Sequence, residues 1–150
     1  GDEWKWNETT WKVLWPKELS HAENEDSILA LVTVMKQTIL LTGDASEKVE
    51  EAVVKDNPHL QFSILKAGHH GSRTSSGEAL LKLVQPRLAF ISCGKHNHYG
   101  HPSPETLARL KATGAIIFRT DQDGQIRLRF TREKLEVTTK LTKRKKELKQ

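Results

Sequence analysis

Short apolar runs separated by polar turns fill this chain, and their spacing predicts strands and helices. Residues 3–15 alternate large apolar and polar side chains, which predicts a β-hairpin. A second hairpin is predicted from the apolar, β-rich runs 28–35 and 38–42, because only Lys36 and Gln37 lie at the turn between them. The N-terminal quarter of the chain is therefore predicted to be a set of antiparallel strands.

Helical and strand-like segments alternate after the second hairpin. Val49, Ala52 and Val53 recur at helical spacing within residues 45–56, and Pro58 is placed to stop that helix. The further predicted elements are a loop over 16–26, a strand over 60–65, a helix over 77–84, a strand over 87–92, a helix over 104–111, a strand over 115–119, a turn over 121–124 and strands over 125–130 and 135–139. This order predicts an α/β layered domain with a mixed sheet.

Large aromatic residues are concentrated in the first hairpin, which carries Trp4, Trp6, Trp11 and Trp15. A platform that stacks a ligand is one interpretation of such a group. Tryptophans at period-two spacing more often cover one face of a sheet. We therefore predict that they lie in the sheet core or at its edge.

Charge is distributed unevenly along the chain. The net charge is +5, and residues 140–150 contain six of the 24 basic residues and one of the 19 acidic residues. The body, residues 1–139, is therefore neutral, and the last segment is predicted to be a solvated basic tail, helical or frayed. A tail that follows the phosphates of DNA is the alternative interpretation.

Composition bears on two further features, an internal disulfide and a membrane-spanning helix. A single cysteine, Cys93, rules out an internal disulfide, and its place at the end of a strand favours a buried structural thiol over a ligand or nucleophile. No apolar run approaches the roughly 20 residues that a membrane-spanning helix requires.

Asp44 is the first candidate for site chemistry. It follows the apolar strand 38–42 and a glycine, which places a carboxylate at the edge of the predicted sheet, where its oxygens can bind a cation. Its other interpretation is an N-cap for the helix that begins near Ala45. The presence of a histidine-containing loop in the same predicted sheet favours the interpretation of Asp44 as a metal ligand.

The histidine loop is the second candidate for site chemistry. It follows the predicted strand 60–65 and has the sequence Ala67-Gly-His-His-Gly-Ser-Arg-Thr-Ser-Ser76. His69 and His70 are adjacent, so on an extended backbone they point to opposite sides, which favours one as a metal ligand and the other as a neighbour or substrate contact. An ordinary polar loop that caps the next helix through Ser75 or Ser76 explains the serines but not the paired histidines.

A third polar loop, residues 94–102, holds His96, His98 and His101 with Asn97. His101 precedes a proline and is therefore held extended, which suits a general acid/base or a substrate contact. The spacing of His96 and His98 is compatible with a metal site, but it is equally typical of an exposed polar loop.

The ordered motifs LLTGD, GHHGS and ISCGK-x-N-x-YGHP-x-PE resemble the metallo-β-lactamase-like domain of ComEC-type DNA-uptake proteins, over about residues 4–128. The resemblance implies an αββα sandwich, of which residues 1–139 look like the C-terminal half. It implies that Asp44 bridges two metal ions and that the His69-His70 pair supplies a late ligand, for which we favour His69, the nearer to the strand end. It also implies that Asn97, Tyr99 and His101 line the substrate cleft.

The activity implied by this resemblance is that of a metal-dependent phosphodiesterase or nuclease, with zinc or manganese, acting on the DNA strand that is not imported. The family's early HxHxDH ligand motif is absent from the 150 residues. We therefore expect the isolated chain to be inactive and to hold no metal or an incomplete set.

The expected partners are DNA, the remainder of a membrane parent protein with this soluble domain on its extracytoplasmic side, and a second copy of the chain through an exposed sheet face. The alternative function is a non-catalytic module that binds DNA or a protein partner.

Overall fold

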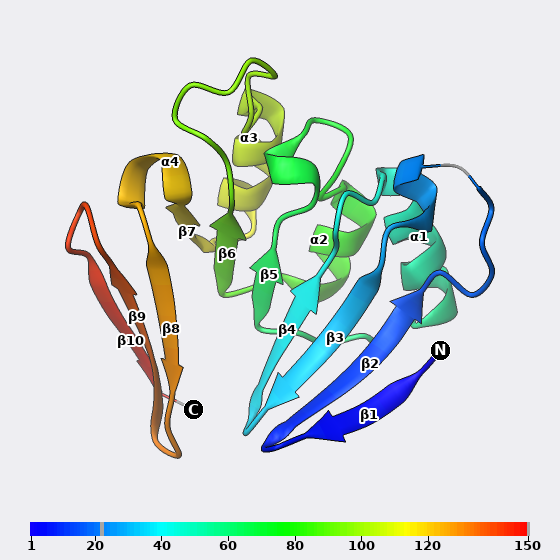
Figure 1. Ribbon diagram of the computed structural model, residues 1–150, viewed down its shortest axis with the longest axis horizontal. Coiled ribbons are helices and arrows are strands. Elements are labelled where there is room, and N and C mark those ends of the chain that lie inside the picture. The colour runs from blue at the N-terminus through cyan, green and yellow to red at the C-terminus, as the bar shows by residue number, and fades with distance from the viewer. Residues whose placement is uncertain (22, 150) are drawn as a thin grey trace.

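A seven-stranded mixed sheet is the main layer of the chain in a computed structural model, which describes residues 1–21 and 23–149 (Figure 1). Its order is β1-β2-β3-β4-β5-β6-β7, antiparallel from β1 to β4 and parallel from β4 to β7. The strands are β1 (Glu3–Trp6), β2 (Thr9–Trp15), β3 (Leu29–Val34), β4 (Gln37–Leu41), β5 (Ile64–Lys66), β6 (Leu88–Ile91) and β7 (Ile116–Arg119). The predicted mixed sheet is confirmed.

Helices cover one face of this sheet, as the layered prediction requires. They are α1 (Glu47–Asp56), α2 (Glu78–Val84) and α3 (Pro104–Ala112), while α4 (Thr120–Asp123) is a single turn where a turn was predicted. Short 3-10 turns occupy Glu23–Asp26 and His69–Gly71. The first turn lies inside the predicted loop 16–26, of which Ala22 is not described. Pro104 begins α3 and Ser103 caps it, because the Ser103 hydroxyl accepts from the Thr106 amide.

A smaller antiparallel sheet packs on the other face. Its order is β10-β9-β8, made of β8 (Ile126–Phe130), β9 (Lys134–Thr139) and β10 (Lys145–Lys149). The prediction of a helical or frayed tail is wrong for β10, because its backbone pairs with β9 and Leu148 lies in register with Leu135. Gln150, the last residue of that predicted tail, lies outside the described residues.

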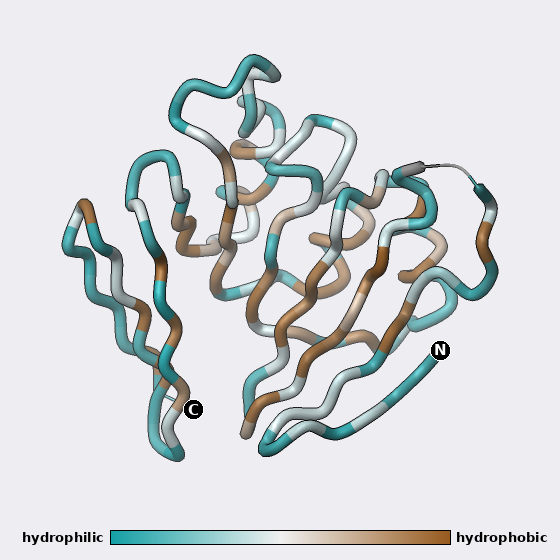
Figure 2. The backbone as a smooth tube through the Cα atoms, in the orientation of Figure 1, coloured by the Kyte–Doolittle hydropathy of each residue, from teal (hydrophilic) through white to brown (hydrophobic). Residues whose placement is uncertain are grey.

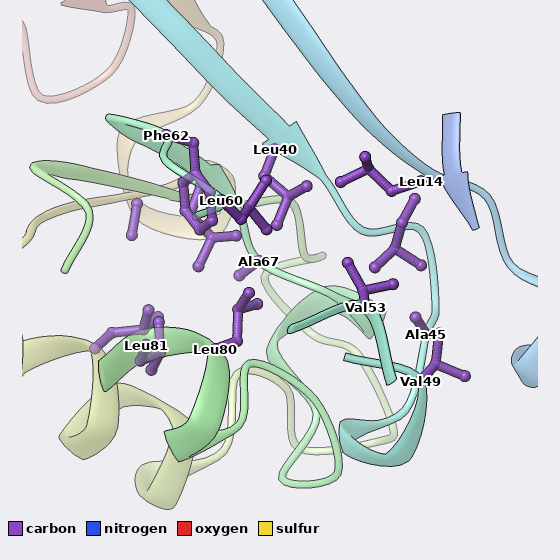
Figure 3. Packing of buried hydrophobic residues seen from close by; sticks show 14 of the residues in the cluster. Leu14, Leu40, Ala45, Val49, Val53, Leu60, Phe62, Ala67, Leu80 and Leu81 are labelled. Atoms are coloured by element: carbon purple, nitrogen blue, oxygen red, sulfur yellow. The ribbon is translucent and has the colours of Figure 1, made fainter. Parts of the chain in front are cut away.

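Two hydrophobic cores hold the layers together, and Figure 2 shows the apolar residues following the strands. The first core joins the helices to the large sheet through residues such as Leu40, Val53 and Leu80 (Figure 3). The second joins the two sheets, where Phe90 stacks on Phe118 at 5.5 Å between ring centroids. The second core continues only as far as Ile39 of β4, so the small sheet packs mainly over β5, β6 and β7.

The same face of the large sheet remains apolar beyond the second core. The registers place Trp4, Trp11 and Val32 in one row with Ile39. β1 is the edge strand, and the residues Trp4 and Trp6 are 47% and 65% exposed, so these tryptophans lie at the sheet edge and not in the core. Among the described residues, no helix has the length and apolar character of a membrane span.

Candidate functional site

The ends of the parallel strands bring the predicted site residues to one edge of the large sheet. Parallel strands end on the same side, so the segments after β4, β5 and β6 lie next to one another. The His69 amide donates to the Gly43 carbonyl at 2.9 Å, which fastens the residue before Asp44 to the histidine loop. Asp44 and His69 therefore stand on adjacent loops, as the sequence predicted.

The histidine pair lies in a tight turn, not on extended backbone. His69 has a φ of 45° and His70 a φ of 55°, so the premise that an extended chain separates the two rings is wrong. Their ring centroids are nevertheless 6.4 Å apart and nearly perpendicular. The two imidazoles thus face different neighbours.

His70 has a fixed tautomer. Its Nδ1 lies 2.7 Å from the Ser92 carbonyl oxygen, which can only accept, so Nδ1 donates. In the neutral ring the lone pair is then on Nε2, the arrangement that is typical of a metal-bound histidine. This contact gives His70 a feature of a ligand that the sequence, which favoured His69, did not reveal.

Asp44 does not cap helix α1. The N-cap is Ser46, whose side chain makes no capping bond, so the alternative N-cap interpretation of Asp44 is wrong. Burial lowers the pKa of the nearby Lys66 ammonium, and the charge of Asp44 opposes this shift. Lys66 also donates to the Ala67 carbonyl at 2.9 Å. Asp44 therefore lies close enough to the Lys66 ammonium to influence its pKa, and it does not cap α1.

The third loop places His101 beside the histidine pair. Its ring lies 5.7 Å from the His69 ring and 5.9 Å from the Tyr99 ring, which stacks on it. Burial lowers the pKa of His101, and the neighbouring His69 and His70 lower it further, so this environment favours the neutral ring. A shallow hollow beside these rings is lined by His70, Cys93, Gly94, Asn97, Tyr99 and His101.

Asn97 and Cys93 both line this hollow, but their side chains have different roles. The Asn97 side chain donates to the carbonyls of Gly94 and His101 and accepts from the His101 amide, so it holds the loop together. The half-buried Cys93 thiol donates to Asp121, and burial raises its pKa to about 11, which does not suit a nucleophile. His96 and His98 are exposed and lie outside the lining of the hollow.

The described residues do not form a closed metal site. Within residues 1–21 and 23–149, no three His, Cys, Asp or Glu side chains are grouped so that they could hold an ion. Asp44 and one histidine of the pair are suitable in chemistry, but they are two ligands, and a structural or catalytic zinc site takes at least three protein ligands. These residues therefore do not fit a metal by themselves.

Two side chains that sequence reasoning missed hold the histidine loop. Glu50 of α1 is buried, and its two carboxylate oxygens accept from the amides of Ser76 and Gly77 at 2.8 Å and 2.7 Å. Neither Ser75 nor Ser76 caps α2, contrary to the polar-loop interpretation; Ser75 bonds the Gly68 and Ser72 carbonyls instead. A helical wheel places Glu50 beside Val53 on the apolar side of α1, and this position in the sequence could have identified Glu50 as a buried residue.

Arg109 of α3 is the second side chain that binds this loop. Its guanidinium donates to the carbonyls of Arg73, Ser75 and Ser76, at 2.9 to 3.1 Å. Two further bonds join α3 and its N-cap to this loop: the Ser103 amide donates to Gly71 and the Thr106 hydroxyl donates to Ser72. The loops that carry His69 and His101 are therefore one connected unit.

We expect Arg109→Lys to lower the free energy of unfolding by about 1–3 kcal/mol, because an ammonium cannot reproduce the planar fork that reaches three carbonyls. Urea denaturation measures this change. The control is Lys111→Ala, an exposed residue of the same helix, which is expected to change stability by less than about 0.5 kcal/mol. Equal effects of the two substitutions would contradict this role of Arg109.

Sequence comparison assigns the class of protein. The profile of the metallo-beta-lactamase superfamily matches residues 13–96. The chain therefore belongs to the metallo-beta-lactamase superfamily, and its mixed α/β architecture is consistent with that fold.

Curated relatives narrow this assignment. The chain is 36% identical to ComE operon protein 3 of Bacillus subtilis over 109 residues, which are 73% of the chain and 14% of that protein. It is 34% identical to Recombination protein 2 of Haemophilus influenzae over 144 residues, 95% of the chain and 18% of that protein. It is 35% identical to Competence protein ComA of Neisseria gonorrhoeae over 125 residues, 82% of the chain and 18% of that protein.

These relatives and the superfamily match support a domain of the ComEC competence-protein type, as the motifs predicted. The chain spans less than a fifth of the length of each of these three relatives. It corresponds to one part of much larger competence proteins.

Proposed function

We propose that the chain forms one wall of a metal-dependent phosphodiesterase site that cleaves DNA in a competence protein. The observation that carries the proposal is the gathering of Asp44, the His69-His70 pair and His101 at one edge of the sheet, in a member of the metallo-beta-lactamase superfamily. Asp44 and one histidine of the pair contribute metal ligands. His101 and Tyr99 contact the substrate, and Asn97 holds their loop in place.

The proposed substrate in the intact protein is the DNA strand that is not imported. The names of the relatives, which refer to competence and recombination, support a nucleic-acid substrate. Residues 1–139 act as the C-terminal portion of the domain, on the extracytoplasmic side of a membrane parent. The remaining ligands, for zinc or manganese, come from outside these 150 residues, so the isolated chain is inactive.

The exposed apolar face around Trp4 and Trp6 supports contact with the rest of that parent protein. Alternatively, two copies of the chain pair with each other through this face. Sedimentation of the purified chain distinguishes them, because a self-pairing chain becomes dimeric as its concentration rises.

The test uses the complete gene product that carries this sequence, with a labelled single-stranded DNA and manganese. Asp44→Asn and His70→Gln are each expected to lower cleavage by at least about 100-fold, since even outer-shell partners of a metal contribute about 10- to 100-fold. His59→Gln is the matched control, because His59 is exposed and precedes β5, whereas the site residues follow the strands. A parallel His69→Gln variant identifies which histidine of the pair is the ligand.

Wild-type cleavage by both Asp44→Asn and His70→Gln would overturn the proposal. Metal-dependent turnover by the purified 150-residue chain would overturn the claim that the isolated chain is inactive because it lacks the remaining metal ligands. A gene product that binds DNA without cleaving it would favour the alternative, a non-catalytic binding module.

A further inference from the structure

The positive charge of this protein is concentrated in the small sheet. Residues 126–149 contain ten of the 24 basic residues and three of the 19 acidic residues, a net charge of +7. The rest of the chain consequently has a net charge of −2. Because β8, β9 and β10 are paired strands, this charge is attached to a folded surface and not to a flexible tail.

The strand registers separate the two faces of the small sheet. Phe130, Leu135 and Leu148 lie in one row and pack into the core between the sheets. Arg127 and Lys145 flank Thr138 on the opposite face, which points away from the large sheet (Figure 1). We call this outward surface the basic face; its basic residues are Arg127, Arg129, Lys134, Lys145 and Lys149.

Two arginines of the basic face form no ion pair with an acidic side chain in the described part of the chain. Glu136 and Glu147 are the acidic residues of this face, and both are engaged by Lys134, at 2.7 Å and 3.0 Å. Lys145 also pairs with Glu147, at 2.9 Å. Arg127 and Arg129 are exposed, and within the described part of the chain neither forms an ion pair. Their guanidinium groups are available to an external anion.

We infer that the basic face binds the backbone phosphates of DNA. Guanidinium groups bind phosphate oxygens through two parallel hydrogen bonds, and a surface with several such groups attracts a polyanion. The single aromatic residue of this segment, Phe130, is turned into the core, so the face has no platform for stacking bases. Binding there is therefore through phosphates and independent of base sequence. This inference does not depend on the hydrolysis proposed above.

The experiment measures binding of the purified chain to a fluorescein-labelled 20-nucleotide single-stranded DNA by anisotropy, with EDTA present so that no hydrolysis intervenes. The test variant is Arg127→Gln/Arg129→Gln/Lys145→Gln. The control variant, Lys5→Gln/Lys55→Gln/Lys111→Gln, removes the same charge from exposed positions outside the small sheet. Thermal unfolding verifies that both variants are folded.

The test variant is expected to bind at least about tenfold more weakly at low salt, and its slope of log affinity against log salt is expected to be smaller by about 2, as for three lost phosphate contacts on a single strand. The control variant is expected to bind nearly as wild type. Equal losses in the two variants would overturn the inference, because net charge alone would then explain binding. Unchanged DNA binding in the test variant, together with loss of its binding to phosphatidylglycerol vesicles, would overturn it in favour of a membrane surface.

Discussion

Gly71→Ala is expected to lower the free energy of unfolding by about 3 kcal/mol or more, from backbone strain and overpacking combined. Gly71 has a φ of +83°, a conformation that alanine adopts only with strain. A Cβ atom there would lie 2.6 Å from the Cβ and 3.1 Å from the Cα of Pro102, a rigid ring that cannot turn aside. Relief of this overlap would also move the neighbouring His101 away from His69.

The matched control for this substitution is Gly100→Ala in the loop that packs against Gly71. Gly100 has a similar φ of +70°, but no heavy atom lies within 4 Å of the position that a Cβ atom would take, so only the backbone strain of about 1–2 kcal/mol is expected. Urea denaturation of the two variants separates strain from overlap. If Gly100→Ala proved as costly as Gly71→Ala, the close approach of Pro102 would contribute nothing to stability.

The pattern of apolar residues predicted most of the fold, because the cores determine where apolar residues occur. A strand that faces one core alternates, whereas β6, which lies between both cores, is a continuous apolar run. The alternation that predicted the strand 135–139, for example, is the inward and outward alternation of β9. β10 was missed because its sequence, KKELK, has one apolar residue and low strand propensity. Its structure depends on pairing with β9, a contact that no local pattern reveals.

The site was predicted where unusual residue types follow apolar runs. Asp44, the histidine pair and His101 were identified for that reason, and the parallel order of the strands explains why they meet. The residues that hold them were not identifiable in this way. Arg109 acts through backbone carbonyls more than 30 residues distant in sequence, and His70 through the carbonyl of Ser92. Such contacts are specified only by the tertiary fold.

Glu50→Gln is expected to destabilise the chain more at pH 5 than at pH 8. Burial raises the pKa of Glu50 from 4.5 to about 7, and the amides of Gly77 and Ser76 oppose this shift only in part. A carboxyl whose pKa is raised on folding contributes its full stability below the unfolded value of 4.5 and loses it as the pH rises to about 7. The wild type therefore loses about 3 kcal/mol over this range, which glutamine does not lose.

The difference in unfolding free energy between wild type and Glu50→Gln, measured in urea from pH 5 to pH 8, isolates this effect, because all other ionisable groups are the same in both proteins. At pH 5 the variant is expected to be less stable by about 1–3 kcal/mol, since glutamine has one acceptor oxygen for two buried amides. This deficit should shrink, and can reverse sign, by pH 8. A deficit that stays constant or grows with pH would contradict the raised pKa, because it would mean that the two amides stabilise the carboxylate more than burial destabilises it. Glu50 would then be ionised at neutral pH and would hold the histidine loop as a charged cap of α2.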